Sequence, residues 1–312
     1  MKNDIASKVY LSDPRRIADL INGSFFQGRK VIQWQDIEET NGQLLLVEGE
    51  DEKEYGIRHH DIICKAVYGM NFVIVGLENQ NDIHYAMVVR YMEYIVKEYA
   101  GQVRRLRAEH RQNRDLTGAE YLSGMSRYDR LHPVIILVVY YGEKKWDAAT
   151  ELKDMLDWSG IPREWKYFAM DCRMNLLEVN EIRKLDCFET DVKLVFGFLQ
   201  RRSDGEAVKR FVEDNRQGFS HLAEEAYDMI SSLSRTRELE SVKSACKTQE
   251  GAMNMCKAIE DLIVEGKREG KLEGREEGRK EILRILHRQI EKGCSIQEIQ
   301  AFLNRELQKT RK

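Results

Sequence analysis

The sequence predicts a mixed α/β fold made of a helix, a β-hairpin, a second helix and a buried strand, followed by a helical C-terminal region. Two predicted strands, Tyr55 to Tyr68 and Phe72 to Glu78, flank Gly69-Met70, and a continuous apolar run extends from Val134 to Tyr141. Elsewhere apolar residues recur at helical spacing, above all from Glu178 to Leu262. Strands and helices in this order are typical of a compact α/β layer.

Length and composition limit the possible classes of protein. The 312 residues can form one large or two ordinary domains, and a hydrophobic content of 42% is enough for a core. Six cysteines without a CxxC pair exclude a zinc finger or a disulfide framework. The N-terminus lacks a secretory h-region, and the longest apolar run, Val134 to Tyr141, is too short to span a membrane. We therefore expect a cytoplasmic chain with reduced thiols and no membrane contact.

The first predicted element is a helix that starts at Ser12-Asp13-Pro14, because proline is tolerated in the first helical turn. Its apolar stripe is expected before Gly23 and consists of Ile17, Leu20 and Ile21. A short strand at Leu44 to Val47 is expected before the hairpin.

The hairpin has a register that can be predicted. Gly69-Met70 suits a two-residue type II′ turn, in which glycine comes first, and Tyr68 then pairs with Asn71. This register places Asp61 directly opposite Glu78, with Cβ atoms about 5 Å apart. Gln80, two positions further, points to the same face of the sheet.

Two carboxylates held this close repel each other unless they share a proton or a cation. Mg²⁺ prefers oxygen ligands, so Asp61 and Glu78 are candidate ligands of a divalent metal. The alternative is an exposed charged sheet edge, and the residues alone leave both interpretations open. Phe72 to Leu77 is apolar on both faces, which favours a buried strand that ends at a cleft with Glu78.

Other polar residues of the hairpin have simpler interpretations. Adjacent strand residues face opposite sides, so of His59 and His60 only His59 shares the face of Asp61. A surface histidine is favoured over a metal ligand there. Lys65 shares the same face further from the cleft and is interpreted as a sheet-face cation.

Asn81 or Asp82 is expected to cap the second helix, which reaches about Tyr99 and is stopped by Gly101. Its buried stripe is predicted to be Met87, Tyr91, Met92 and Ile95. Arg90 on this helix could face a bound phosphate or lie on a solvated surface, and the sequence does not separate the two.

A basic segment follows this helix. The net charge of −3 gives no global attraction to nucleic acid, so any contact with DNA must come from a local patch. Only Glu109 opposes the five arginines of the segment, which are Arg104, Arg105, Arg107, Arg111 and Arg114. They suit contacts with a phosphate backbone, and an exposed helix extension explains them equally well.

The middle of the chain contains a strand and several helices. Val134 to Tyr141 is typical of a strand buried on both faces. A helix is predicted from Asp147 to about Leu156, and a later helix has an apolar stripe of Val192, Val195, Phe196 and Leu199. Three tryptophans are interpreted as packing anchors rather than base-stacking platforms: Trp146, Trp158 and Trp165.

The tail has a different character. Four glycines recur every four residues, at Gly266, Gly270, Gly274 and Gly278. Each costs a helix about 1 kcal/mol relative to alanine, so residues 265–281 are predicted to be a charged linker or a fraying helix. A close helix–helix contact over the glycine face is the alternative.

Residues 282–312 are predicted to form two helices. The first ends at Gly293, and Ser295-Ile296-Gln297-Glu298 is a capping box that opens the second. They could pair as a hairpin or a small helix-turn-helix, and could join copies of the chain into a homo-oligomer. The second helix lacks concentrated basic residues, which disfavours DNA reading by it.

Taken together, these residues resemble a known family. Asp61, Glu78 and Gln80 across a hairpin are similar to the PD-(D/E)XK nuclease core, with Gln80 at the usual lysine position. More narrowly, the chain resembles the bacterial recombination-promoting nuclease/putative transposase family from about Tyr10 to Leu307. The resemblance rests on RHHDIICKA, VGLENQNDIHYAMVVRYMEY, PVIILVVYYGEKKWD and EGKREGKLEGREEGRKE.

The resemblance implies a restriction-endonuclease-like core in residues 1–175, followed by a helical region in residues 176–264. It also implies Mg²⁺-dependent cleavage of double-stranded DNA, in recombination, mobile elements or phage defence. Asp61 and Glu78 would be metal ligands and Gln80 a catalytic residue, although a neutral amide orients water or phosphate and cannot act as a base. The rival class is a non-catalytic binding protein that acts through its helical tail, and a third is a helical oligomerisation scaffold.

Overall fold

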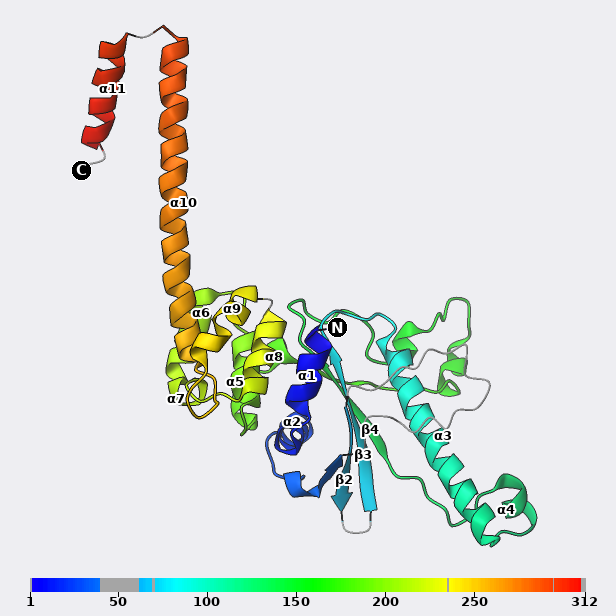
Figure 1. The fold of residues 1–312 in the computed structure, drawn as a ribbon. Coiled ribbons are helices and arrows are strands. Elements are labelled where there is room, and N and C mark those ends of the chain that lie inside the picture. The colour runs from blue at the N-terminus through cyan, green and yellow to red at the C-terminus, as the bar shows by residue number, and fades with distance from the viewer. Residues whose placement is uncertain (1, 40–61, 69–70, 235, 294, 310–312) are drawn as a thin grey trace. The chain divides into compact units, whose positions relative to one another are not determined.

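A computed structural model describes residues 2–39, 62–68, 71–234, 236–293 and 295–309 (Figure 1). The chain divides into two compact units, Met1–Cys256 and Lys257–Lys312. It is a mixed α/β protein with one described sheet in the first unit and helices through the rest of the chain. No helix in the described ranges is both long enough and apolar enough to cross a membrane.

In the described part of the chain the sheet has five strands, in the order β1-β2-β3-β4-β5. Their bounds are β1 Ile37–Glu39, β2 Ile62–Tyr68, β3 Asn71–Gln80, β4 Val134–Tyr140 and β5 Asn175–Glu178. The first three strands pair antiparallel, whereas β3, β4 and β5 run parallel. β3 is therefore an inner strand, with its hairpin partner on one side and a parallel neighbour on the other.

The hairpin has the predicted register. Tyr68 is paired with Asn71, and Ile62 is paired with Leu77. β3 continues to Gln80, two residues beyond the predicted end of the strand. Asp61, His59 and His60 lie outside the described residues, as does the strand expected at Leu44 to Val47.

Two N-terminal helices precede the sheet, α1 (Lys2–Leu11) and α2 (Pro14–Phe26). α2 begins at Pro14 as predicted, and the side chain of Asp13 accepts a hydrogen bond of 2.8 Å from the Arg15 amide. The predicted stripe of Ile17, Leu20 and Ile21 is buried, and α2 continues past Gly23 to Phe26. A Cβ at Gly23 would lie 2.2 Å from the Phe188 ring, so this glycine allows close packing inside the helix.

A buried polar junction joins α2 to the segment before α5 (Val192–Leu199). The guanidinium of Arg16 donates to both carboxylate oxygens of Asp191, at 2.9 and 2.8 Å. The Asp19 carboxylate accepts hydrogen bonds from the amides of Glu189 and Thr190. Because a buried charge needs such partners, these bonds fix how α2 and α5 meet.

Helix α3 (Met87–Asn113) is longer than predicted. It begins after Ala86 rather than at Asn81 or Asp82, and it passes through Gly101 without stopping. A glycine inside a helix costs only about 1 kcal/mol. The side chain of the neighbouring Gln102 accepts a hydrogen bond of 2.7 Å from the His132 amide and donates one of 3.1 Å to the His132 carbonyl. The helix ends at Asn113, and the C-cap residue Arg114 has a left-handed φ of 53°.

The core between α3 and the sheet consists of Met87, Tyr91, Tyr94, Ile136, Val138, Tyr140, Trp146 and Met174. Tyr94 was not predicted to be buried, whereas Met92 and Ile95 are only half-buried. Ile136 to Tyr140 are buried, as expected for a strand covered on both faces. On the other face of the sheet, the Tyr141 ring contacts Phe196 of α5.

The predicted helix at Asp147 to Leu156 is wrong. Only a short 3-10 turn forms, η2 (Leu152–Met155). The backbone here bonds a distant segment instead: the Leu152 amide donates to Cys172 and the Met174 amide donates to Thr150. A second 3-10 turn, η3 (Arg163–Tyr167), lies in the chain between Leu152 and Cys172.

The rest of the first unit is helical, as predicted. Its helices are α5, α6 (Gly205–Asp214), α7 (Arg216–Phe219), α8 (Glu224–Ser234) and α9 (Arg237–Cys246). The predicted stripe of α5 is fully buried.

Two helices make up the C-terminal part, α10 (Met255–Glu291) and α11 (Ile296–Lys309). Residues 265–281 are helical, and open space surrounds the position where each of the four repeat glycines would carry a Cβ, within the described part of the chain. The predicted capping box is confirmed: the Ser295 amide donates to Glu298 Oε2 at 2.7 Å, and the Glu298 amide donates to Ser295 Oγ at 3.4 Å.

Candidate functional site

Glu78 is a buried carboxylate near the carboxyl end of β3. It pairs with Val138 of the parallel strand β4, and only 1% of its surface is exposed. Removing a carboxylate from water is costly unless hydrogen bonds and an opposite charge replace the lost hydration. The groups that surround Glu78 therefore determine what it can do.

Two side chains converge on the same carboxylate oxygen. Arg90 Nη2 lies 2.5 Å from Glu78 Oε1, and Gln80 Nε2 donates a hydrogen bond of 2.9 Å to that oxygen. Gln80 can reach it because residues two apart in a strand share a face. Arg90 reaches it from the first turns of α3, which covers that face.

Arg90 is itself fixed by a tyrosine. Its Nε donates a hydrogen bond of 2.7 Å to Tyr94 Oη, and its guanidinium lies 5.6 Å from the centre of the Tyr94 ring. We call Glu78, Gln80, Arg90 and Tyr94 the Glu78 cluster. The structure thus brings together three residues predicted as site residues and adds Tyr94, whose part could not be read from the sequence.

A divalent metal would need more ligands than the cluster contains. The cluster offers the Glu78 carboxylate and the Gln80 amide oxygen, and Arg90 already neutralises the carboxylate. Within the described residues, no group of three or more His, Cys, Asp or Glu side chains is placed to hold a metal ion. The donors fit a cation only with a second carboxylate, which is the role that the sequence predicts for Asp61.

A cavity of about 470 Å³ opens beyond the carboxyl ends of β3 and β4. Ligands of α/β proteins commonly bind at this end of parallel strands. Its charged and phenolic lining consists of Asp82, Tyr85, Tyr140, Tyr141, Glu143, Lys144, Asp147 and Arg202. Burial and the nearby Asp82 carboxylate raise the pKa of Tyr140, so its hydroxyl remains protonated at neutral pH.

The cavity begins just after Gln80, because Asn81 and Asp82 follow this residue directly. Sequence reasoning missed Asp82 as a cavity residue because it assigned this position to a helix cap. The sequence did contain a signal for Asp82: it comes soon after a predicted strand, and the residues that follow two parallel strands meet at one edge of the sheet.

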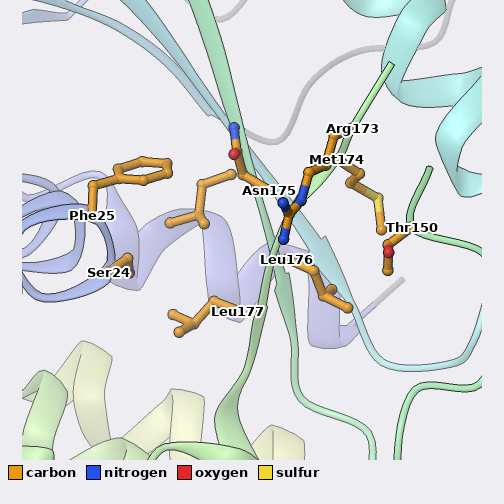
Figure 2. A pocket seen from close by; sticks show the side chains of 9 residues that line it. Ser24, Phe25, Thr150, Arg173, Met174, Asn175, Leu176 and Leu177 are labelled. Carbon is orange, nitrogen blue, oxygen red and sulfur yellow. The ribbon is translucent and has the colours of Figure 1, made fainter. Parts of the chain in front are cut away.

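A second hollow, of about 540 Å³, lies between α2 and β5 (Figure 2). Ser24 and Phe25 line it from α2, and Asn175 and Leu177 line it from β5. Among the residues that the structure describes, Arg173 is the one charged residue of its lining.

The predicted basic segment forms the C-terminal half of α3, which extends away from the sheet (Figure 1). All five arginines are exposed. Arg105 Nη2 pairs with the buried Glu98 at 2.9 Å, and Arg107 Nε donates to the Ser123 carbonyl at 3.0 Å. At about 1.5 Å of rise per residue, the segment lies roughly 20–35 Å along α3 from Arg90.

The three tryptophans differ in their surroundings. Trp146 is buried and its ring contacts Tyr140, as expected of a packing anchor. Trp158 is half-buried, with Lys166 Nζ 5.3 Å from the centre of its ring. The interpretation of Trp165 as an anchor is wrong, because 61% of its surface is exposed.

The fold and the cluster define a mixed α/β protein with a buried carboxylate at the end of an inner strand. Residues 58–227, more than half of the chain, match the family described as "Putative transposase, YhgA-like". The chain belongs to this family. No curated protein and no solved structure matches the chain.

Proposed function

We propose that this protein is a divalent-metal-dependent DNA endonuclease that acts in recombination, on mobile elements or in phage defence. The observation that carries the proposal is the buried Glu78 carboxylate, with Gln80 and Arg90 gathered on one of its oxygens. The order α2, β2–β3, α3, β4 suits a restriction-endonuclease-like core. Membership of a transposase family supports DNA as the substrate.

Asp61 and Glu78 would hold the cation, with Mg²⁺ as the expected ion. The register of β2 and β3, in which Ile62 faces Leu77, is the one from which the sequence predicts that Asp61 faces Glu78. When bound, a divalent cation lowers the pKa of a water molecule and stabilises negative charge on the phosphate.

Gln80 would position the reacting groups. Its amide nitrogen is already directed at Glu78, which leaves the amide oxygen to accept a hydrogen bond from the attacking water. Because an amide takes no proton at neutral pH, Gln80 orients the water and does not act as its base.

Arg90 would have two partners in turn. In the structure its guanidinium neutralises Glu78. A divalent cation at Glu78 would take over that neutralisation, and the guanidinium could then bind phosphate oxygens with its planar fork. The Tyr94 hydroxyl, which holds Arg90 Nε, would keep the side chain near the site.

The exposed arginines of α3 would bind the DNA backbone at a site distant from the reacting phosphate. Their distance of roughly 20–35 Å from Arg90, from the rise per residue, is comparable to one turn of duplex DNA, about 34 Å. With a net charge of −3 for the whole chain, binding would depend on this local patch.

One observation favours a second candidate function. The ion pair between Arg90 and Glu78 already neutralises the charge of the buried carboxylate, as it would in a member of the family that binds without cleaving. In that case the protein would bind nucleic acid or protein and act through its helical tail.

A plasmid-nicking assay with and without Mg²⁺ separates the two candidates. We expect the parent to nick DNA only with Mg²⁺, and Glu78→Gln and Asp61→Asn to be inactive. Glu98→Gln is the matched control, because Glu98 is also a buried carboxylate paired with an arginine of α3. If the parent binds DNA but never nicks it with any divalent metal, the non-catalytic function replaces the proposed one.

A further inference from the structure

The far end of α3 carries a compact extension. It is formed by residues 104–130, which comprise the end of α3, the short helix α4 (Gly118–Ser123) and the loop that follows (Figure 1). We call these residues the α3–α4 tip. The tip contributes no residue to the core between α3 and the sheet.

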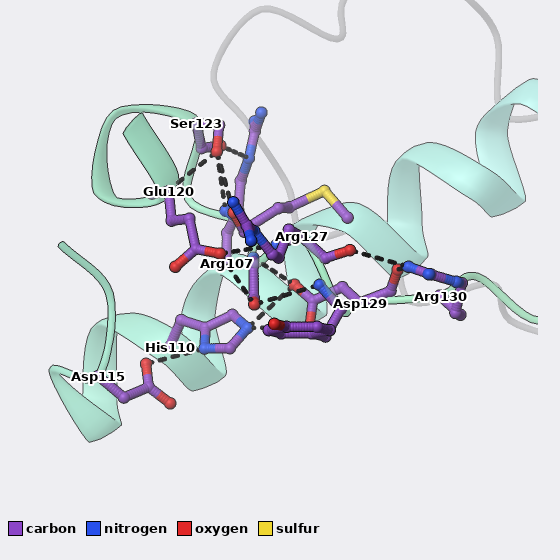
Figure 3. A network of polar contacts seen from close by, with 11 residues as sticks. Arg107, His110, Asp115, Glu120, Ser123, Arg127, Asp129 and Arg130 are labelled. Carbon is purple, nitrogen blue, oxygen red and sulfur yellow. Dashed lines mark hydrogen bonds and ion pairs between the residues drawn. The ribbon is translucent and has the colours of Figure 1, made fainter. Parts of the chain in front are cut away.

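A histidine between two aspartates holds the tip together. His110 Nδ1 lies 2.8 Å from Asp115 Oδ1, and His110 Nε2 lies 3.0 Å from Asp129 Oδ2 (Figure 3). The two aspartates lie on either side of α4 in the chain. His110 therefore connects both ends of the segment from Asp115 to Asp129 to α3.

Further bonds direct the carboxylates of the tip inward. Asp129 Oδ2 accepts a hydrogen bond of 2.8 Å from the Ser126 amide. Glu120 Oε1 accepts one of 2.8 Å from the Arg127 amide (Figure 3). Three acidic side chains of the tip thus bind other tip residues, which reduces their effect on the outer surface.

The arginines, in contrast, are exposed. The tip contains seven arginines and four acidic residues, a formal charge of +3 without His110, although the whole chain has −3. The arginines are Arg104, Arg105, Arg107, Arg111, Arg114, Arg127 and Arg130, and all are exposed. This surface is complementary in charge to a polyanion.

Large apolar side chains are also exposed on the tip. Tyr121 is 73% exposed, Leu122 86% and Tyr128 77%. The Arg127 guanidinium lies 5.9 Å from the centre of the Tyr128 ring. An open hollow of about 710 Å³, lined among others by Ser123, Met125 and Tyr128, lies beside α4.

We propose that the α3–α4 tip binds DNA that has unpaired bases, with Tyr121 and Tyr128 stacked on those bases and the arginines on the backbone. In an intact duplex the bases stack on each other. Such a duplex can pair its phosphates with the arginines, but it offers no base face on which the exposed rings could stack. Unpaired bases offer flat apolar faces to tyrosine, and the neighbouring phosphates pair with arginine. The inference deepens the proposed function by naming bulged or branched DNA as the substrate class.

Binding by the full-length chain, without divalent metal so that no cleavage occurs, tests the inference. The probes are a labelled duplex and the same duplex with a short unpaired bulge. We expect tighter binding to the bulged probe. We also expect Tyr121→Ala with Tyr128→Ala to lose about a hundredfold in affinity for it, since each of the two lost stacks costs roughly tenfold. Affinity for the plain duplex should stay nearly unchanged.

Two control variants accompany this test. Tyr167→Ala removes a tyrosine that is 88% exposed but lies in η3, outside the tip, and should behave like the parent. Tyr121→Phe with Tyr128→Phe keeps both rings and should retain the preference for the bulged probe.

Equal binding of the two probes by the parent, or an unchanged preference in the double alanine variant, would overturn the inference. So would altered sedimentation of the double alanine variant with unaltered DNA binding, because the rings would then join copies of the chain. The proposed nuclease activity fails separately: a parent that prefers bulged DNA but never nicks it retains the tip function alone.

Discussion

Arg90 Nη2 lies 2.5 Å from Glu78 Oε1, so the first turns of α3 supply the positive charge that a buried carboxylate of β3 requires. The pair is asymmetric, because the Glu78 side chain is almost completely buried whereas Arg90 reaches solvent. Loss of Glu78 leaves an arginine that water can hydrate. Loss of Arg90 leaves a charged carboxylate in the protein interior.

Replacing Arg90 should therefore destabilise the first unit. We expect Arg90→Gln to lower the free energy of unfolding by about 3 kcal/mol, as is usual when one partner of a buried ion pair is removed. Added Mg²⁺ should raise the melting temperature of this variant more than that of the parent, because the metal no longer competes with the guanidinium for Glu78.

Arg105→Gln is the control, since Arg105 is an exposed arginine of α3 paired with the buried Glu98. Its response to Mg²⁺ should match that of the parent. Equal Mg²⁺ responses of Arg90→Gln and the parent would mean that Glu78 does not bind the metal.

The second prediction concerns Gln80. Removal of one preorganised polar group commonly lowers a rate by on the order of 10²-fold, and we expect this loss of nicking rate for Gln80→Ala. Gln80→Lys should retain activity, because its ammonium can also reach Glu78 and lysine is the usual residue of PD-(D/E)XK nucleases. A Gln80→Ala protein that nicks as fast as the parent would remove Gln80 from the site.

The hairpin could be predicted because its information is local. The sequence Gly69-Met70 predicts a two-residue turn, and such a turn fixes one register for the two strands, which the pairing of Tyr68 with Asn71 follows. The capping box of Ser295 and Glu298 is local in the same way.

Other features depend on contacts distant in sequence. Asn81 and Asp82 have the composition of a helix cap, but β3 extends to Gln80 and α3 begins only at Met87. The pairing of Glu78 with Arg90 follows from how α3 packs on the sheet. Sequence could identify both residues as candidates, but it gave no sign that they bind each other.

The third prediction is a pH dependence of the α3–α4 tip. The hydrogen bond to Asp115 raises the pKa of His110 above its ordinary value, and the bond to Asp129 acts in the same direction. A raised pKa in the folded state means that the protonated form stabilises the tip. This stabilisation is complete below the unfolded-state pKa of about 6.5 and is lost as the pH rises through the higher folded-state pKa.

Amide hydrogen exchange at Ser126 and Arg127 measures this effect, once the rates are corrected for the intrinsic effect of pH. Protection in the parent should fall as the pH rises through the folded-state pKa of His110. His110→Gln should show weak protection that does not change over this pH range. The Gln102 amide, in the middle of α3, is the internal reference. A pH-independent protection of the tip in the parent would contradict the role given to His110.

The last prediction separates the arginines of α3 by their partners. Arg105 pairs with Glu98 and Arg107 donates to the Ser123 carbonyl, so both already have a role within the protein. We therefore expect the other three, Arg104, Arg111 and Arg114, to make the stronger contacts with the backbone of bound DNA. Each lost phosphate contact lowers the slope of log affinity against log salt by about 0.9, so replacing these three by glutamine should lower it by nearly 3. Arg105→Gln, measured with the same duplex, should change the slope much less. An equal change from Arg105→Gln alone and from the triple variant would show that exposure along α3, and not the protein's own contacts, decides which arginines hold DNA.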